Sequence, residues 1–185
     1  MQKFFRAFLS DPRTTGSIIE SSPFLIKKML KPINFEKAEI IVELGAGTGV
    51  ITKKILKKMG PNTSLLCFET NKVLAKELKR KNKDSRLKVY SDSAENFGRY
   101  LKRFGKDKAD YVISGLPLVV LPKKIADKII KEILENLHPK GVYVQFQYSL
   151  TSRKLFKKLF GQVKIDFTPA NIPPAFVYSC KLGKK

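Results

Sequence analysis

The sequence has few of the residues on which several kinds of chemistry depend. Its 185 residues include one histidine and two cysteines. His138, the single imidazole, lies at an expected helix end, and the sequence has no constellation for Ser–His–Asp or metal chemistry. Cys67 and Cys180 each lie inside an apolar run that is typical of a strand. We therefore expect two buried, reduced thiols and no disulfide or metal.

Long apolar stretches are also absent. No run approaches the roughly 20 residues that span a bilayer, and no segment has the composition of a secretory signal. We therefore expect a cytoplasmic protein, either free or bound peripherally to the inner face of the membrane.

Acidic residues are scarce relative to basic ones. The chain has 37 Lys and Arg against 16 Asp and Glu, which gives a net charge of +21 and a pI of about 10.0. A charge this positive attracts nucleic acid or the anionic face of a membrane. A general preference for lysine on solvated helix faces explains part of the excess equally well.

Apolar runs alternate along the chain with helical segments, as in βαβ units. The two closing runs have no helix between them, so they must pair antiparallel or lie apart in the sheet. The pattern predicts an α/β, Rossmann-like domain over residues 1–185, with a seven-stranded, mostly parallel sheet and an antiparallel last strand. Short N-terminal helices are expected over 1–34, and His138 is expected to cap a helix C-terminus. The expected strands are 39–44, 64–68, 87–90, 110–113, 141–148, 163–167 and 176–182, and the expected helices are 50–59, 71–81, 94–104, 124–137 and 151–160.

A glycine-rich loop, Glu43-Leu44-Gly45-Ala46-Gly47-Thr48-Gly49, joins the first expected strand to a helix. Its glycines turn the chain sharply and let the backbone approach a ligand. The G-x-G-x-G spacing lacks the later glycine of the dinucleotide fingerprint. Glu43 also suits a cationic amino acid moiety better than a pyrophosphate.

Two acidic residues follow the next two strands. Glu69 lies about 20 residues beyond the loop, where a carboxylate can accept from both ribose hydroxyls. Asp92 is placed to accept from an adenine amino group. Each feature alone is also explained by a tight turn or a helix cap, but all three lie after the carboxyl ends of adjacent strands, where open α/β sheets bind ligands.

With these features the sequence resembles the class I methyltransferases, over nearly the whole chain. The resemblance implies S-adenosylmethionine as cofactor, S-adenosylhomocysteine as product, and no metal. The implied cofactor-binding residues are Thr15, Gly16, Ser17, Glu43, Gly45, Ala46, Gly47, Thr48, Gly49, Glu69, Thr70, Asp92, Ser93, Ala94 and Ser114.

The loop after the fourth strand, Ser114-Gly115-Leu116-Pro117-Leu118, indicates the acceptor. Adenine-methylating enzymes carry a polar residue, a proline and then an aromatic ring that stacks on the flipped base. Leu118 takes the place of that ring here. The loop therefore has the form of an amino-methylating site without a base-stacking platform.

Together with this loop, three more segments resemble the soluble bacterial phospholipid N-methyltransferases, which convert phosphatidylethanolamine to phosphatidylcholine, and related enzymes that act on ornithine lipids. They are Thr15–Ile18 with Ser21-Ser22-Pro23, then Gln145-Phe146-Gln147-Tyr148, and Asn171-Ile172-Pro173-Pro174-Ala175. The resemblance implies a lipid head-group amine as substrate and an anionic membrane surface as partner. We expect a monomer.

Two alternatives remain. The ribosomal RNA adenine dimethyltransferases share the first strands but add a C-terminal helical domain that grips RNA, whereas this chain ends directly after its last expected strand. A SAM-binding or membrane-binding protein without activity is the third possibility.

The N-terminal segment bears on the lipid hypothesis. Large apolar residues recur at helical spacing beside Lys3 and Arg6, which suits a helix lying in a membrane interface or acting as a cofactor lid. Packing on the domain explains the same periodicity. The apolar residues are Met1, Phe4, Phe5, Phe8 and Leu9.

Methyl transfer from a sulfonium is an in-line displacement, so positioning carries most of the catalysis. We expect the hydroxyl of Ser114 and nearby backbone carbonyls, including those of Gly115 and Leu116, to hold the amine. Tyr148 or Tyr143 would orient it, and aromatic faces would favour the substituted product cation. The candidate lipid-phosphate contacts are Arg13 and Arg153.

Overall fold

The computed structural model describes residues 21–183 and is built around one seven-stranded sheet with the order β3-β2-β1-β4-β5-β7-β6. This confirms the expected α/β fold. The strands are β1 (Ile40–Leu44), β2 (Ser64–Phe68), β3 (Leu87–Tyr90), β4 (Ala109–Ser114), β5 (Leu137–Gln147), β6 (Gln162–Thr168) and β7 (Ala175–Lys181). The helices are α2 (Pro23–Leu30), α3 (Val50–Leu56), α4 (Lys72–Lys81), the 3-10 turn η1 (Ala94–Asn96), α5 (Phe97–Arg103), α6 (Lys123–Asn136) and α7 (Arg153–Leu159).

The strand directions follow the sequence pattern. Strands β1 to β5 pair in parallel, and β7 pairs antiparallel with both β5 and β6. The chain moves outward from β1 to β3 and then returns to β4 on the other side of β1. Such a reversal of strand order opens a crevice at the carboxyl ends of β1 and β4, where ligands bind in sheets of this kind.

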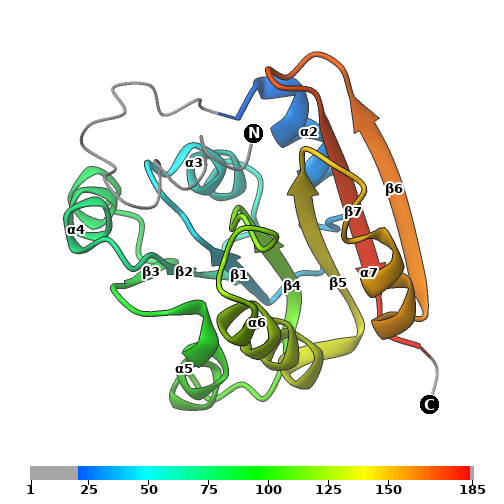
Figure 1. The fold of residues 1–185 in the computed structure, drawn as a ribbon. Helices are drawn as coiled ribbons and strands as arrows, with labels where there is room; N and C mark the ends of the chain where they lie inside the picture. The colour runs from blue at the N-terminus through cyan, green and yellow to red at the C-terminus, as the bar shows by residue number, and fades with distance from the viewer. Residues whose placement is uncertain (1–20, 184–185) are drawn as a thin grey trace.

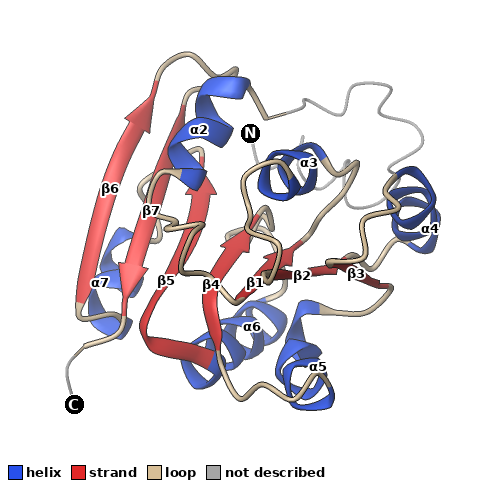
Figure 2. Cartoon of the chain, turned by 180° about the vertical axis from the view of Figure 1, so that it is seen from behind, coloured by secondary structure: helices blue, strands red, loops and turns tan. Residues whose placement is uncertain are grey.

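Helices cover both faces of the sheet (Figures 1 and 2). One core contains residues of α2, α3 and α4, such as Met29, Ile55 and Leu78. The other contains residues of α5, α6 and α7, such as Phe97 and Ile133. With a helical layer on each side, β1 is buried along its whole length, which explains why all its residues except Glu43 are apolar.

The start of β5 differs from the expectation. The prediction that His138 caps a helix was wrong, because α6 ends at Asn136 and His138 lies near the start of β5. Leu137 is buried and pairs with Ala109 of β4, so the chain passes from helix to strand without a cap. The Nδ1 of His138 instead accepts the backbone N–H of Lys140 at 3.1 Å.

Other local predictions are confirmed. Asn71 caps α4 by accepting the N–H groups of Val73 and Leu74. Cys67 and Cys180 are free and buried in strands.

Of the N-terminal extension, the described part contains α2, which Ser22 caps; the amphipathic segment before it lies outside the described residues. No helix within residues 21–183 is long and apolar enough to cross a membrane.

Candidate functional site

The glycine loop between β1 and α3 turns through three left-handed positions. The φ angles are 74° at Gly45, 53° at Gly47 and 83° at Gly49. Residues with a Cβ rarely adopt this left-handed region. The N–H groups of Gly45 and Ala46 donate to the Phe68 carbonyl at 2.9 and 3.2 Å. The loop is therefore fastened to the end of β2.

Glu69, the first residue after β2, holds two segments together. Its Oε2 accepts the Gly47 N–H at 2.9 Å, and its Oε1 accepts the Asn71 N–H at 2.9 Å. A carboxylate has about four acceptor positions, so lone pairs remain on both oxygens. Glu69 is thus oriented beside the loop with capacity to accept a vicinal diol, as predicted for the ribose.

Glu43, the last but one residue of β1, is buried under the loop. Its Oε2 accepts from the Thr52 hydroxyl at 2.7 Å and from the Cys67 thiol at 3.2 Å. Its Oε1 is equally buried and has no hydrogen-bond partner in the described part of the chain. Burial raises the pKa of the Glu43 carboxyl to about 7, against the opposing effect of the two donors. The site therefore contains a carboxylate oxygen that lacks a donor or a cation.

The loop after β4 packs directly against the glycine loop. The Gly115 N–H donates to the Leu44 carbonyl at 2.9 Å. A Cβ at Gly45 would lie 2.6 Å from Cδ2 of Leu116, and a Cβ at Gly115 would lie 3.1 Å from the Gly45 carbonyl oxygen. The expected cofactor loop and acceptor loop are thus in van der Waals contact, and glycine at both positions allows it.

A cavity of about 220 Å³ opens beside this junction, at the carboxyl ends of β4 and β5. Most of its walls are apolar. The predicted residues Gly115, Leu116 and Tyr148 belong to it. The full lining is Gly115, Leu116, Pro117, Val119, Val120, Phe146, Gln147, Tyr148, Ser149 and Thr151.

Segments far apart in the sequence meet around this cavity. The Gln145 Nε2 donates to the Leu116 carbonyl at 2.9 Å, which ties β5 to the loop after β4. The buried Asn171 accepts the Ser22 N–H at 3.0 Å and hydrogen-bonds to Tyr148. Burial raises the pKa of the Tyr148 phenol, so it stays neutral. Of the four segments singled out in the sequence, all but Thr15–Ile18 lie in the described residues, and these meet at one place.

Three predicted acceptor contacts need correction. Ser114 is fully buried, and its Oγ accepts the Leu116 N–H at 3.2 Å. Tyr143 is 0% exposed, donates to the Gln145 Oε1 at 2.8 Å and stacks on Phe160. The Leu116 carbonyl accepts from both Gln145 and Leu118. These groups support the acceptor loop from the core side. The side chains of residues 143 and 145 point into the core because side chains alternate between the two faces of a strand.

Leu118 also lies elsewhere than expected. It is 7% exposed and belongs to the core under α6, so its position is not a platform in the cavity. The aromatic surface comes from Phe146 and Tyr148, which contact edge to face at 5.6 Å. The cavity therefore has aromatic walls even though residue 118 is a leucine.

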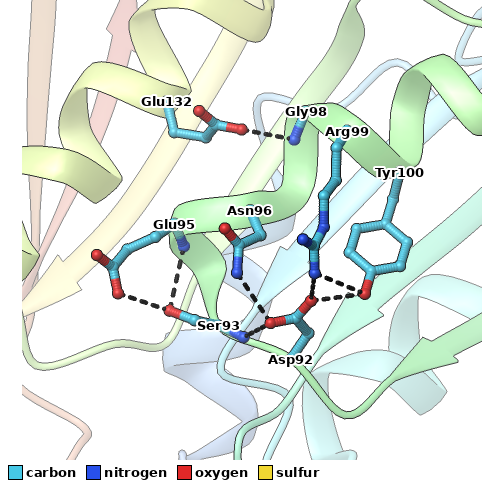
Figure 3. Close-up of polar contacts among 8 residues, drawn as sticks. All are labelled: Asp92, Ser93, Glu95, Asn96, Gly98, Arg99, Tyr100 and Glu132. Carbon is cyan, nitrogen blue, oxygen red and sulfur yellow. Dashed lines mark hydrogen bonds and ion pairs between the residues drawn. The ribbon is translucent and has the colours of Figure 1, made fainter.

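Asp92 is surrounded by protein donors (Figure 3). Its Oδ1 accepts from the Ser93 N–H and the Asn96 amide, and its Oδ2 accepts from the Tyr100 hydroxyl and the Arg99 guanidinium. The Tyr100 hydrogen bond is the largest cause of a pKa far below the ordinary value. All four acceptor positions are used. An adenine amino group could bind Asp92 only by displacing a donor, and the Arg99 side chain, 53% exposed, is the one that water can replace.

The remaining predicted residues lie close to these groups or outside the described part. Ser93 caps η1, and Ala94, the first residue of η1, is buried. Thr48 in the glycine loop and Thr70 next to Glu69 are accessible. Arg153 is exposed at the start of α7, two residues from the cavity wall. The prediction omitted Phe146 and Gln147 as site residues, although their segment was noted. Arg13, Thr15, Gly16 and Ser17 fall outside residues 21–183.

These features fit S-adenosylmethionine. The unpaired oxygen of Glu43 can receive its ammonium, Glu69 can accept its ribose hydroxyls, and the backbone of the glycine loop can approach it closely. Among residues 21–183 no three His, Cys, Asp or Glu side chains gather in a way that could hold a metal ion.

Comparison with known proteins gives the fold and the family. The fold resembles the O-methyltransferase TomG from Streptomyces achromogenes, solved in complex with SAM, with a TM-score of 0.69 at 15% identity over 97% of this chain and 89% of that one. The chain is a class I, SAM-dependent methyltransferase. It belongs to the ribosomal RNA adenine dimethylase family, whose model matches residues 12–162.

Two curated relatives act on different substrates. An ornithine lipid N-methyltransferase from Singulisphaera acidiphila is 29% identical over 180 residues, which cover 96% of this chain and 94% of the relative. A ribosomal RNA small subunit methyltransferase A from Mycoplasmopsis synoviae is 27% identical over 72% of this chain, and the match spans 48% of that relative. The two relatives are thus named for different substrates, a lipid and an RNA.

The contact between the loops predicts different effects for two glycine substitutions. Gly45→Ala and Gly105→Ala place a Cβ at nearly the same φ, 74° and 73°, so each should cost about 1 kcal/mol of stability. Only the Cβ at position 45 meets Leu116, whereas that at 105 meets nothing within 4 Å. We expect Gly45→Ala alone to weaken SAM binding by roughly tenfold or more, equivalent to about 1.4 kcal/mol. Calorimetric titration with SAM, beside urea unfolding, measures both; equal SAM affinity in the two variants would contradict the assignment.

The buried Glu43 predicts a pH dependence of stability without cofactor. Because its folded pKa is raised from 4.5 to about 7, the folded state holds the proton more tightly than the unfolded state. Stability should fall as pH rises from 4.5 through about 7, by up to about 3 kcal/mol. Urea unfolding across this range should show a flatter profile for Glu43→Gln than for the wild type. The exposed Glu36→Gln is the matched control, and an unchanged slope in Glu43→Gln would refute the prediction.

Proposed function

We propose that this methyltransferase acts on the head-group amine of a membrane lipid: phosphatidylethanolamine, its methylated forms or an ornithine lipid. The observation that carries the proposal is the apolar cavity at the junction of the two loops. Two of the lipid-enzyme-like segments line it, and Asn171 of a third hydrogen-bonds to the lining residue Tyr148. A small aliphatic amine suits the volume and the aromatic walls of the cavity. The end-to-end similarity to an ornithine lipid N-methyltransferase supports the same substrate class.

Exposed apolar side chains near the cavity support a membrane approach. Val119 lies in the loop after β4, Leu150 in the loop after β5 and Ile172 in the β6–β7 loop. These loops follow parallel strands and therefore share one edge of the sheet, where Figure 1 also shows the start of α2. Ile172 is 82% exposed. Apolar side chains at loop tips can enter the acyl boundary of a bilayer, which would bring a head group to the cavity.

A basic groove supports an anionic surface as partner. It lies along α2 and α3 and has an apolar floor that includes Ile26, Leu30 and Ile33. Its charged lining residues are all lysines: Lys27, Lys28, Lys31, Lys54 and Lys58. Lysines near a membrane surface each add about 1 kcal/mol of attraction to anionic lipids.

The chemistry requires positioning and an unprotonated amine. When bound, S-adenosylmethionine supplies a methyl group on a positively charged sulfur. The lone pair of the amine forms the new N–C bond as the S–C bond breaks, and that electron pair stays on sulfur. The protein contributes a mostly apolar cavity, which disfavours the ammonium form, and the rings of Phe146 and Tyr148, which favour the substituted cation that results. That product passes its proton to solvent before another round.

RNA methylation is the second candidate. The family match and the partial similarity to an RNA methyltransferase favour it, and the net charge of +21 suits either polyanion.

Methyl transfer from labelled SAM decides between these substrates. The protein would be incubated separately with vesicles of phosphatidylethanolamine, monomethylated lipid or ornithine lipid in an anionic background, and with protein-free ribosomal RNA. We expect label in the lipid phase and none above background in RNA. If no lipid receives label at saturating SAM, the proposal is contradicted. Label in RNA alone would establish the second candidate.

The membrane approach predicts a loss of vesicle binding when the apolar loop tips are made polar. The double variant Leu150→Ser/Ile172→Ser should weaken cosedimentation with anionic vesicles by roughly tenfold, because each exposed apolar side chain contributes on the order of 1 kcal/mol when buried. Val73→Ser is the control, because Val73 is 56% exposed on α4 beside a different part of the sheet. Equal vesicle binding of the double variant and the control would show that these loops do not meet the membrane.

A further inference from the structure

Gln147, the last residue of β5, carries an unsatisfied amide in the cavity wall. Its side chain is 4% exposed, and neither Oε1 nor Nε2 has a hydrogen-bond partner among residues 21–183. It also lines the cavity at the carboxyl end of β5. A buried amide with both ends unpaired costs about 1–3 kcal/mol, so stability does not account for it.

A second glutamine on the same strand shows the contrast. Gln145 lies two residues earlier on the same face of β5 and is equally buried. Its Oε1 accepts from Tyr143, and its Nε2 donates to the carbonyls of Leu116 and Phe146. Gln145 is therefore structural, whereas the amide of Gln147 is left for a partner that enters from the cavity.

The walls around Gln147 restrict what that partner is. Its neighbours in the cavity include Leu116, Val120 and Phe146, which offer no side-chain hydrogen bonds. The hydroxyls that also line the cavity pair elsewhere, Tyr148 with Asn171 and Ser149 with Thr151. A ligand that pairs with Gln147 must itself supply a hydrogen-bond donor for Oε1 and an acceptor for Nε2. A head group with an amine close to a phosphate, carboxylate or amide oxygen supplies both.

We infer that the Gln147 carboxamide binds the acceptor head group, with Oε1 accepting from the N–H of the amine that is methylated and Nε2 donating to a neighbouring oxygen. The inference rests on the proposed function, in that it takes an aliphatic amine as the acceptor.

A neutral amide suits this task better than a carboxylate. A carboxylate beside the amine would stabilise its ammonium form and raise its pKa, which would remove the lone pair needed for attack. A carboxamide orients the N–H without adding negative charge. None of the described residues that line the cavity is acidic; Glu43 and Glu69 lie on β1 and directly after β2, on the cofactor side of the loop junction.

Two substitutions test the assignment. Gln147→Met keeps the length of the side chain and removes both polar atoms. We expect it to lower kcat/KM for the lipid by about tenfold or more, since one hydrogen bond of this strength corresponds to that factor. The SAM affinity should be unchanged and the Tm equal or higher, because an unpaired amide has been removed. Gln147→Glu should shift the acidic limb of the pH–kcat profile upward by about one pH unit, since it raises the pKa of the bound amine and kcat reports groups in the enzyme–substrate complex.

The exposed Gln162→Met is the matched control and should change none of these quantities. A lowered Tm together with lost activity in Gln147→Met would show a structural role and overturn the inference. So would unchanged kcat/KM in that variant, or an unshifted pH profile in Gln147→Glu.

The wild-type transfer assay separates this result from the proposed function. If the wild type methylates RNA alone, the proposed function fails. The profile of Gln147→Glu is then measured with RNA, and an unshifted profile identifies a non-basic adenine amino group at Gln147 and overturns the aliphatic-amine assignment.

Discussion

The close contact between the glycine loop after β1 and the loop after β4 is the constraint on which the rest of the site depends. The Gly115 N–H donates to the Leu44 carbonyl, and a Cβ at Gly45 or at Gly115 would force the facing loop to shift. This contact exists because β1 and β4 are neighbours at the point where the strand order reverses. It brings the groups that suit the cofactor within reach of a cavity that suits a small amine.

A second layer of buried groups holds this junction in place. Tyr143 donates to Gln145, which in turn donates to the Leu116 carbonyl, so the acceptor loop is fixed from the core. Glu69 fixes the glycine loop from the other side through the Gly47 N–H. Among the described residues, four have buried side-chain polar atoms without a hydrogen-bond partner: the hydroxyls of Thr168 and Ser179, and, at the site, Glu43 Oε1 and the Gln147 amide. Glu43 Oε1 and the Gln147 amide both occur where a ligand is expected. Each lowers the stability of the fold when no ligand is bound, as is usual for groups of a binding site.

Much of the fold and the cofactor half of the site was predictable because its signals are local. Period-two and period-3.6 patterns located the strands and helices, and the Gly45–Gly49 spacing after a buried strand located the loop. The acceptor half was not predictable in detail. Whether Ser114, Tyr143 or Leu118 faces the cavity or the core depends on how β4 and β5 pair and on which helices cover them. Asp92 was placed correctly after β3. Its hydrogen bonds to Tyr100 and Arg99 were not predictable, because they depend on how α5, which carries these residues seven and eight positions later, packs against the loop.

The sequence by itself determined the class of protein, because the glycine loop, Glu43 and Glu69 act through backbone conformation and charge that neighbouring residues specify. Only the tertiary structure decided which residues line the cavity. It turned Tyr143 and Ser114 into supports and left Gln147 unpaired in the cavity wall. The physical reason is that hydrogen-bond satisfaction is a property of the packed chain: Gln145 and Gln147 are the same residue type on the same face of one strand, and only their surroundings distinguish them.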